Sequence, residues 1–155
     1  MKTRPSAKKS SNPNSSIIQK LDQILEMELS GVTRYLHYSL MITGPNRIPI
    51  VKFFRDQASE ALQHATIIGE KITALGGHPS VRVSPVPETH KHSTMEILEE
   101  SLGFEKVGMA MYLKVLPLCK NNVALEELIR EFIKIEQEHI EEVEKMLKIS
   151  GDRRL

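Results

Sequence analysis

The sequence of 155 residues lacks several features that would place it in common protein classes. Its one cysteine, Cys119, cannot form a disulfide within the chain and is typical of a reducing compartment. No apolar run reaches the roughly 18 residues of a membrane-spanning helix, and the N-terminus lacks the apolar stretch of a secretory signal. A net charge of +1 gives no reason to expect a nucleic-acid partner. These absences predict a cytoplasmic protein without a membrane segment.

Motifs for several common activities are also missing. The chain has no G-x-x-x-x-G-K-S/T phosphate loop, no G-x-S-x-G nucleophile elbow and no Cys-x-x-Cys pair. Aromatic residues are sparse, with four Phe, three Tyr and no Trp, whereas Leu, Ile, Glu and Lys are plentiful. This composition favours helix over sheet and gives no support to a hydrolase or a nucleotide-binding protein.

Apolar residues at helical spacing predict four long helices, and the links between them predict the topology. Two links, residues 44–48 and 120–122, are short, so each joins antiparallel neighbours. The middle link, residues 76–92, extends up to about 56 Å, whereas each helix is about 40 Å long. The predicted fold is therefore an all-α four-helix bundle of two antiparallel hairpins joined by one long crossover. The expected helices are residues 17–43, 49–75, 93–119 and 123–149.

The ends of the chain are expected to lie outside this bundle. Residues 1–16 are basic, contain no acid and are rich in Ser and Asn, which predicts a disordered tail. An arm that contacts DNA and an organelle transit peptide are the alternatives for this segment. The bundle domain is expected over residues 17–150, with a short tail at 151–155.

A nine-residue pattern occurs twice, and each copy begins with a glutamate. Residues 28–36 and residues 105–113 both fit E-x-x-G-x-x-x-Y-L. Each copy is followed some thirty residues later by a helical histidine motif, Ala-Leu-Gln-His at 61–64 and Glu-Gln-Glu-His at 136–139. The repeat therefore supplies carboxylate and imidazole, both metal-binding groups, in each half. The second half is complete, whereas the first has Ala61 where the symmetry requires Glu.

Every predicted helix carries an ionisable group in the middle of its apolar stripe. Burial of one unpaired carboxylate costs several kcal/mol, so several acids that face one core require cations between them. A divalent metal pair meets this requirement, because carboxylates bridge two ions and each histidine supplies a nitrogen. Gln57 lies on the same side of its helix as the histidine. The candidate ligands are Glu28, His64, Glu105, Glu136 and His139.

These motifs resemble the ferritin superfamily, and bacterioferritin most of all, over residues 17–149. The resemblance implies a ferritin-like four-helix bundle with a di-iron centre that oxidises Fe(II) to Fe(III) with O2 or peroxide. It also implies iron storage or detoxification inside a shell of 24 subunits. The matching stretches are Glu28-Leu29 with Tyr35, His64-Ala65, residues 75–79, Glu105 with Tyr112, and residues 136–139.

The resemblance also assigns roles to the candidate residues. Glu28 and Glu105 are implied as terminal carboxylates, and Glu136 as a bridge between the two metals. His64 and His139 are implied as nitrogen ligands. A layer of residues that orient these ligands is expected around them, formed by Tyr35, Tyr112 and Gln57.

The chain departs from the family at the second bridging glutamate. Ala61 occupies that position, three residues before His64. The adjacent Glu60 lies near the same helix face, and a slight helix rotation or a local bulge could let it act as the ligand instead. The alternative is an asymmetric site with one weakened iron position.

Two further departures concern haem and assembly. Leu62 stands where bacterioferritin has its haem-binding Met, so no haem of that type is expected. The family also has a short fifth helix, whereas only five residues follow Ser150 in this sequence. A homo-oligomeric shell of 24 subunits is the leading expectation, and smaller assemblies down to a dimer stay open.

Three other functions remain open at this point. The first is a partner subunit of a mixed shell, because Ala61 marks an altered metal site. A protective iron- and DNA-binding ferritin-like protein is the second alternative, with the basic tail on DNA. The third is a manganese or mixed-metal oxidase, because the same ligands suit Mn(II).

Overall fold

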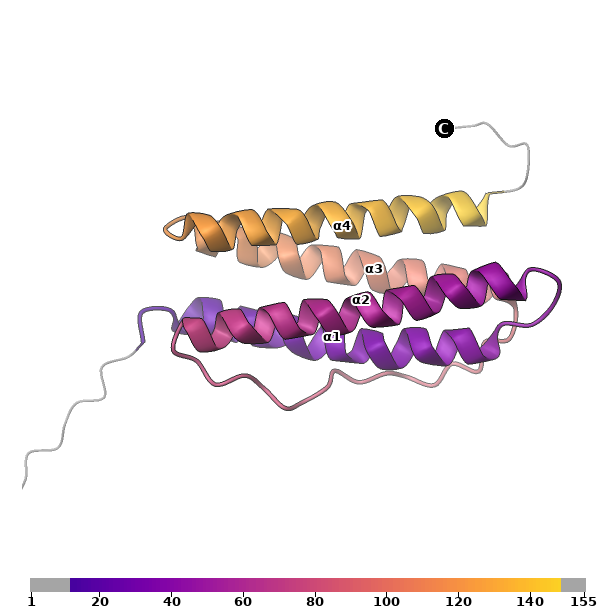
Figure 1. Ribbon diagram of the computed structural model, residues 1–155, viewed down its shortest axis with the longest axis horizontal. Coiled ribbons are helices and arrows are strands. Elements are labelled where there is room, and N and C mark those ends of the chain that lie inside the picture. The colour runs from indigo at the N-terminus through magenta and orange to yellow at the C-terminus, as the bar shows by residue number, and fades with distance from the viewer. Residues whose placement is uncertain (1–11, 149–155) are drawn as a thin grey trace, which may run out of the picture.

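The computed structural model describes residues 12–148, which form four long α-helices (Figure 1). They are α1 (Ser15–Met41), α2 (Arg47–Ala74), α3 (Thr94–Val115) and α4 (Val123–Leu147). The pair α1 and α2 forms one antiparallel hairpin, α3 and α4 form the other, and the segment between α2 and α3 runs back along the bundle (Figure 1). No strand occurs within residues 12–148. The predicted all-α bundle with one long crossover is confirmed.

Pro117 and Asn122 determine the two ends of the connection between α3 and α4. The third helix ends at Val115 rather than at the predicted residue 119, and a 3₁₀ turn, η1 (Leu116–Cys119), follows it. Pro117 lies in this turn, and its missing N–H cannot continue the α-helical hydrogen bonds. Asn122 begins α4, because its side-chain oxygen accepts a hydrogen bond from the N–H of Leu125 at 3.1 Å.

The predicted tails fall largely on residues that the structure does not describe. The N-terminal tail was expected over residues 1–16; residues 1–11 lie outside the described range, and α1 begins at Ser15. The predicted C-terminal tail, residues 151–155, lies wholly outside it. Between residues 12 and 148, no helix combines the length and the apolar character needed to cross a lipid bilayer.

The apolar core consists of two clusters with a polar layer between them. One cluster lies toward the connection of α3 and α4 and includes Ile68 and Ile129. The other lies toward the connection of α1 and α2 and includes Phe54 and Ile97. On each helix, the candidate ligands lie between the segments that contribute to the two clusters. The residues that form this polar layer are Glu28, His64, Glu105, Glu136 and His139.

Hydrogen bonds hold the crossover along α1. The chain leaves α2 at Gly76, whose φ of +79° favours glycine. The N–H of Ser80 donates to Asp22 Oδ1 at 2.8 Å, and its hydroxyl donates to Glu26 Oε1 at 2.6 Å. Arg82 Nε also donates to Glu26 Oε1, at 3.0 Å. The crossover is thereby fixed against the first hairpin.

Candidate metal centre

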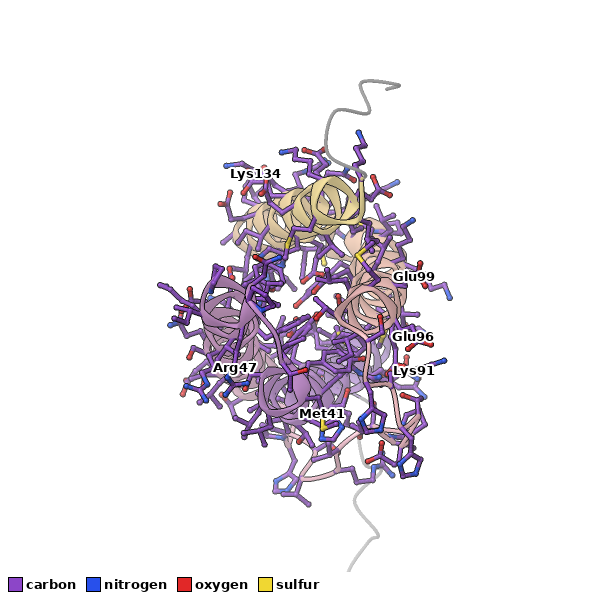
Figure 2. All side chains as sticks on the ribbon, turned by 90° about the vertical axis from the view of Figure 1, so that its right-hand side faces the viewer. Met41, Arg47, Lys91, Glu96, Glu99 and Lys134 are labelled. Carbon is purple, nitrogen blue, oxygen red and sulfur yellow. The ribbon has the colours of Figure 1, made fainter. Side chains whose placement is uncertain are left out.

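The five predicted ligands lie together in one cavity in the middle of the bundle. Viewed along the bundle, oxygen atoms lie inside the ring of four helices, whereas the labelled Arg47 and Lys134 point outward (Figure 2). Three of the cavity-lining acids are 4% to 6% exposed, which is unusual for carboxylates. The predicted ligands in this cavity are Glu28 on α1, His64 on α2, Glu105 on α3, and Glu136 and His139 on α4.

The ligand atoms form two groups that share one glutamate. In the first group, the atoms of Glu28, His64 and Glu136 lie within 4.8 Å of one another. In the second, the atoms of Glu105, Glu136 and His139 meet the same limit. Each group combines carboxylate oxygen with imidazole nitrogen, a donor set that suits Fe(II) and Mn(II). The arrangement can hold two cations with Glu136 between them.

Each histidine faces the carboxylate of its own hairpin through Nδ1. His64 Nδ1 lies 3.4 Å from Glu28 Oε1, and His139 Nδ1 lies 3.5 Å from Glu105 Oε2. The two halves of the sequence repeat therefore produce two similar halves of the centre. This pairing agrees with the spacing of the repeat, which placed one carboxylate and one imidazole in each half.

The acids raise the proton affinity of the centre. Burial raises the pKa of Glu136 to about 10, and the charges of Glu105 and Glu28 add to the effect. Burial alone would lower the pKa of His139, but hydrogen bonds to Glu105 and Glu60 outweigh it and raise this pKa to about 10. In the absence of a cation, Glu136 and His139 therefore keep their protons, which reduces the repulsion between the carboxylates.

Two tyrosines connect the two halves of the centre. The Tyr35 hydroxyl of α1 donates to Glu105 Oε1 on α3, and the Tyr112 hydroxyl of α3 donates to Glu28 Oε1 on α1. Burial and the neighbouring carboxylates raise the pKa of both tyrosines well above the ordinary value. Each tyrosine thus orients a carboxylate of the other half. Gln57, the third residue expected in this layer, is buried and lines the cavity.

The two repeated glycines perform a task that the sequence analysis missed. A Cβ on Gly108 would lie 3.2 Å from Glu136 Oε2, so glycine at this position lets the shared carboxylate approach α3. The matching Gly31 faces Ala61, whose Cβ would lie 3.4 Å from an added Cβ. The ring of Phe104 is also there, at 3.2 Å. Recurrence of Gly three residues after each glutamate was the available signal.

Ala61 and the residues on either side of it differ in burial and in their contacts with the centre. Ala61 is buried and offers no ligand atom. Glu60 is about one-third exposed; its Oε2 lies 3.1 Å from His139 Nε2 and its Oε1 lies 3.8 Å from His64 Nε2. The hydrogen bond from His139 lowers the pKa of the Glu60 carboxyl. Leu62 is 53% exposed.

Comparisons with known proteins agree with this architecture. The ferritin family model, described as a ferritin-like domain, matches residues 18–150. A ferritin-like, diiron-carboxylate protein from Bacillus anthracis str. Ames is 26% identical with a TM-score of 0.84; the match covers 90% of this chain and 100% of that one. No curated protein matches the sequence.

Two bacterioferritin structures share the fold at lower identity. That of Rhodobacter capsulatus is 20% identical with a TM-score of 0.77, over 88% of this chain and 86% of that one. That of Desulfovibrio desulfuricans is 21% identical with a TM-score of 0.80, over 86% of this chain and 79% of that one.

Proposed function

The chain belongs to the ferritin family, and from this premise we propose that it binds two Fe(II) ions in its bundle and oxidises them to Fe(III). The observation that carries the proposal is the pair of ligand groups joined by Glu136. Storage or detoxification of iron is the proposed purpose, because oxidised iron is withdrawn from solution. The same donor set suits Mn(II), so the proposal of iron rests on the family.

The residues of the chain act by positioning and by charge. Glu28 with His64, and Glu105 with His139, hold one ion each, and Glu136 lies between the ions. Buried carboxylates stabilise the higher charge of Fe(III), which favours the loss of an electron from each Fe(II). The two electrons reduce O2, which takes up two protons to give hydrogen peroxide. With peroxide as the oxidant, the two electrons and two protons give two molecules of water.

Named relatives support a dinuclear centre. The Bacillus anthracis protein is described as a diiron-carboxylate protein, and the Desulfovibrio desulfuricans bacterioferritin has a diiron site in different catalytic states. The Rhodobacter capsulatus bacterioferritin is described with a metal-free dinuclear site and haem iron. We propose that the present chain binds no haem of that kind, since Leu62 cannot ligate iron.

Assembly into a shell is part of the proposal. Leu36, Leu40 and Leu62 on the first hairpin are 49% to 60% exposed, and a contact between subunits would cover such apolar surface. The family supports a homo-oligomer, with 24 subunits as the leading expectation and a dimer as the smallest unit. A cytoplasmic location is proposed with it.

A second function is favoured by one observation. Ala61 contributes no carboxylate where the other half has Glu136. A chain with this gap would serve as a partner subunit in a mixed shell if its centre held too little iron to react. No described contact favours the DNA-binding alternative.

An anaerobic Fe(II) titration of the metal-free chain, followed by mixing with O2, separates these functions. We expect two tight ions per chain and rapid oxidation. The Glu136→Ala variant should lose both, because both groups share this carboxylate. Glu138→Ala is the matched control, since Glu138 is an exposed glutamate on the same helix. One tight ion or none in the unmodified chain would contradict the ferroxidase and favour the partner subunit.

A further inference from the structure

Glu60 forms an ion-pair contact with each of the two histidines of the centre. Among the ion pairs of residues 12–148, Glu28 lies against His64 only and Glu105 against His139 only. Glu60 reaches His139 with one oxygen and His64 with the other, at 3.1 Å and 3.8 Å. The first contact is a hydrogen bond, and the second is a longer electrostatic contact.

These contacts are made at the ring nitrogen opposite the one that faces Glu28 or Glu105. The Nδ1 atoms face Glu28 and Glu105, and the Nε2 atoms face Glu60. A neutral imidazole carries a proton on one nitrogen and a lone pair on the other. When a carboxylate accepts the proton of one nitrogen, the lone pair of the other is fixed for a metal.

We infer that Glu60 is a positioning residue that accepts the Nε2–H of His139 and attracts the Nε2–H of His64 over a longer distance, so that both rings present Nδ1 to the metal pair. This inference rests on the proposed function. One carboxylate, supplied by the helix that lacks the bridging glutamate, then orients a nitrogen ligand in each half of the centre. Glu60 compensates for Ala61 from outside the ligand layer.

The geometry separates this role from that of a ligand. Glu60 belongs to neither of the two groups whose atoms lie within 4.8 Å of one another. The helix α2 is regular through this region, without a bulge or an interruption. Ala61 lines the cavity without a ligand atom, and both Ala61 and the ring of Phe104 lie close to Gly31. The ring is itself fixed, because the Arg34 guanidinium lies 4.6 Å from its centroid.

Titration of the full chain with Co(II), whose visible spectrum reports the coordination of the ion, tests this role. We expect Glu60→Ala to retain two ions per chain with the same spectrum, and to bind them about 10- to 100-fold more weakly. The loss should be larger at the position of His139, where the contact is shorter. Glu60→Asp should recover part of the affinity, since it keeps a carboxylate.

The amide variant makes the test more specific. Glu60→Gln leaves one oxygen to accept an Nε2–H, so one of the two binding steps should weaken more than the other. Glu70→Ala and Glu70→Gln are the matched controls, because Glu70 is an exposed glutamate on the same helix. Loss of a whole ion from Glu60→Ala, with a changed spectrum, would make Glu60 a direct ligand and overturn the inference. Unchanged affinity in Glu60→Ala would also overturn it.

A measurement without metal distinguishes failure of this inference from failure of the proposed function. Histidine NMR of the metal-free chain should show a hydrogen-bonded Nε2–H on His139, protected from exchange with water, in the unmodified chain and not in Glu60→Ala. Equal protection in both would show that Glu60 does not hold the ring. If the unmodified chain bound no metal, the ferroxidase would be excluded, while this measurement would still decide whether Glu60 orients the imidazole.

Discussion

The two hairpins of the bundle have the same plan and differ at one carboxylate. In each, a glutamate on the first helix faces a histidine on the second, and a glycine on the first helix faces the residue three positions before that histidine. In α3–α4, the space at Gly108 receives Glu136; in α1–α2, the space at Gly31 receives Ala61 and the ring of Phe104. In the first hairpin, α1 and α2 therefore still approach each other closely at Gly31, although the carboxylate found in the second hairpin is missing. The first half retains the close helix packing of the second, and its Glu60 carboxylate contacts the histidine of each half.

Replacement of Ala61 by Glu, which restores the missing carboxylate, tests the difference between the two hairpins with the largest expected effect. In the metal-free chain, Ala61→Glu adds an acid to a buried site that already holds three. We expect the free energy of unfolding to fall by about 3–5 kcal/mol, the size of an uncompensated buried charge. Chemical denaturation with and without Mn(II) checks this, and bound Mn(II) should recover most of the loss. Higher stability of metal-free Ala61→Glu would contradict the account.

Variation of pH sharpens the comparison, because the second half holds the carboxyl and the imidazole whose pKa values are raised to about 10. The pKa of Glu136 and that of His139 are each raised to about 10, above the ordinary 4.5 and 6.5. Both groups bind protons more tightly in the folded chain, so their contribution to stability is lost as the pH rises toward 10. Between pH 7 and 9, these two groups hold nearly two more protons in the folded chain than in the unfolded one, so the free energy of unfolding of the metal-free chain should fall by about 2–3 kcal/mol per pH unit.

Denaturation at several pH values measures this slope. Saturating Mn(II) should flatten it, because metal ligands are deprotonated in the loaded chain and largely so in the unfolded one. Glu136→Gln should reduce the slope in the metal-free chain. A stability that rises over this range without metal would contradict the assignment of the protons.

The two glycines give the smallest expected effect and the most direct contrast. Gly108→Ala places a methyl group 3.2 Å from Glu136 Oε2, so metal binding should weaken in both groups. Gly31→Ala meets the Phe104 ring at 3.2 Å, and should cost about 1–2 kcal/mol of stability while two tight ions remain. Metal titration and denaturation of both variants compare them. Equal loss of metal from both would show that the glycines do not play separate roles.

The helices and the clustering of the candidate ligands could be predicted from the sequence because both depend on spacing along one chain. Apolar periodicity placed the four helices, and Glu28, His64, Glu105 and Glu136 lay in the same stripes. The third helix ends earlier than predicted, since a 3₁₀ turn that contains Pro117 begins at Leu116. Glycine and Pro mark such points, but the geometry that follows depends on the neighbouring helix.

The contacts of Glu60 and Phe104 depend on distances between helices, which spacing does not give. A helix wheel places Glu60 beside the stripe, but it does not show that both Nε2 atoms face this carboxylate. Likewise, Phe104 precedes a ligand in the sequence, and its position against Gly31 follows only from the packing of α3 on α1.

The crossed tyrosines make each hairpin half of a self-complementary pair. Because Tyr35 donates to α3 and Tyr112 donates to α1, a hairpin alone would leave a buried donor and a buried acceptor unmatched. Two copies of one hairpin would match them again. The α3–α4 hairpin contains Glu105, Tyr112, Glu136 and His139, and so holds every group that a symmetric dimer of hairpins would need. The single chain can be regarded as such a dimer joined by its crossover.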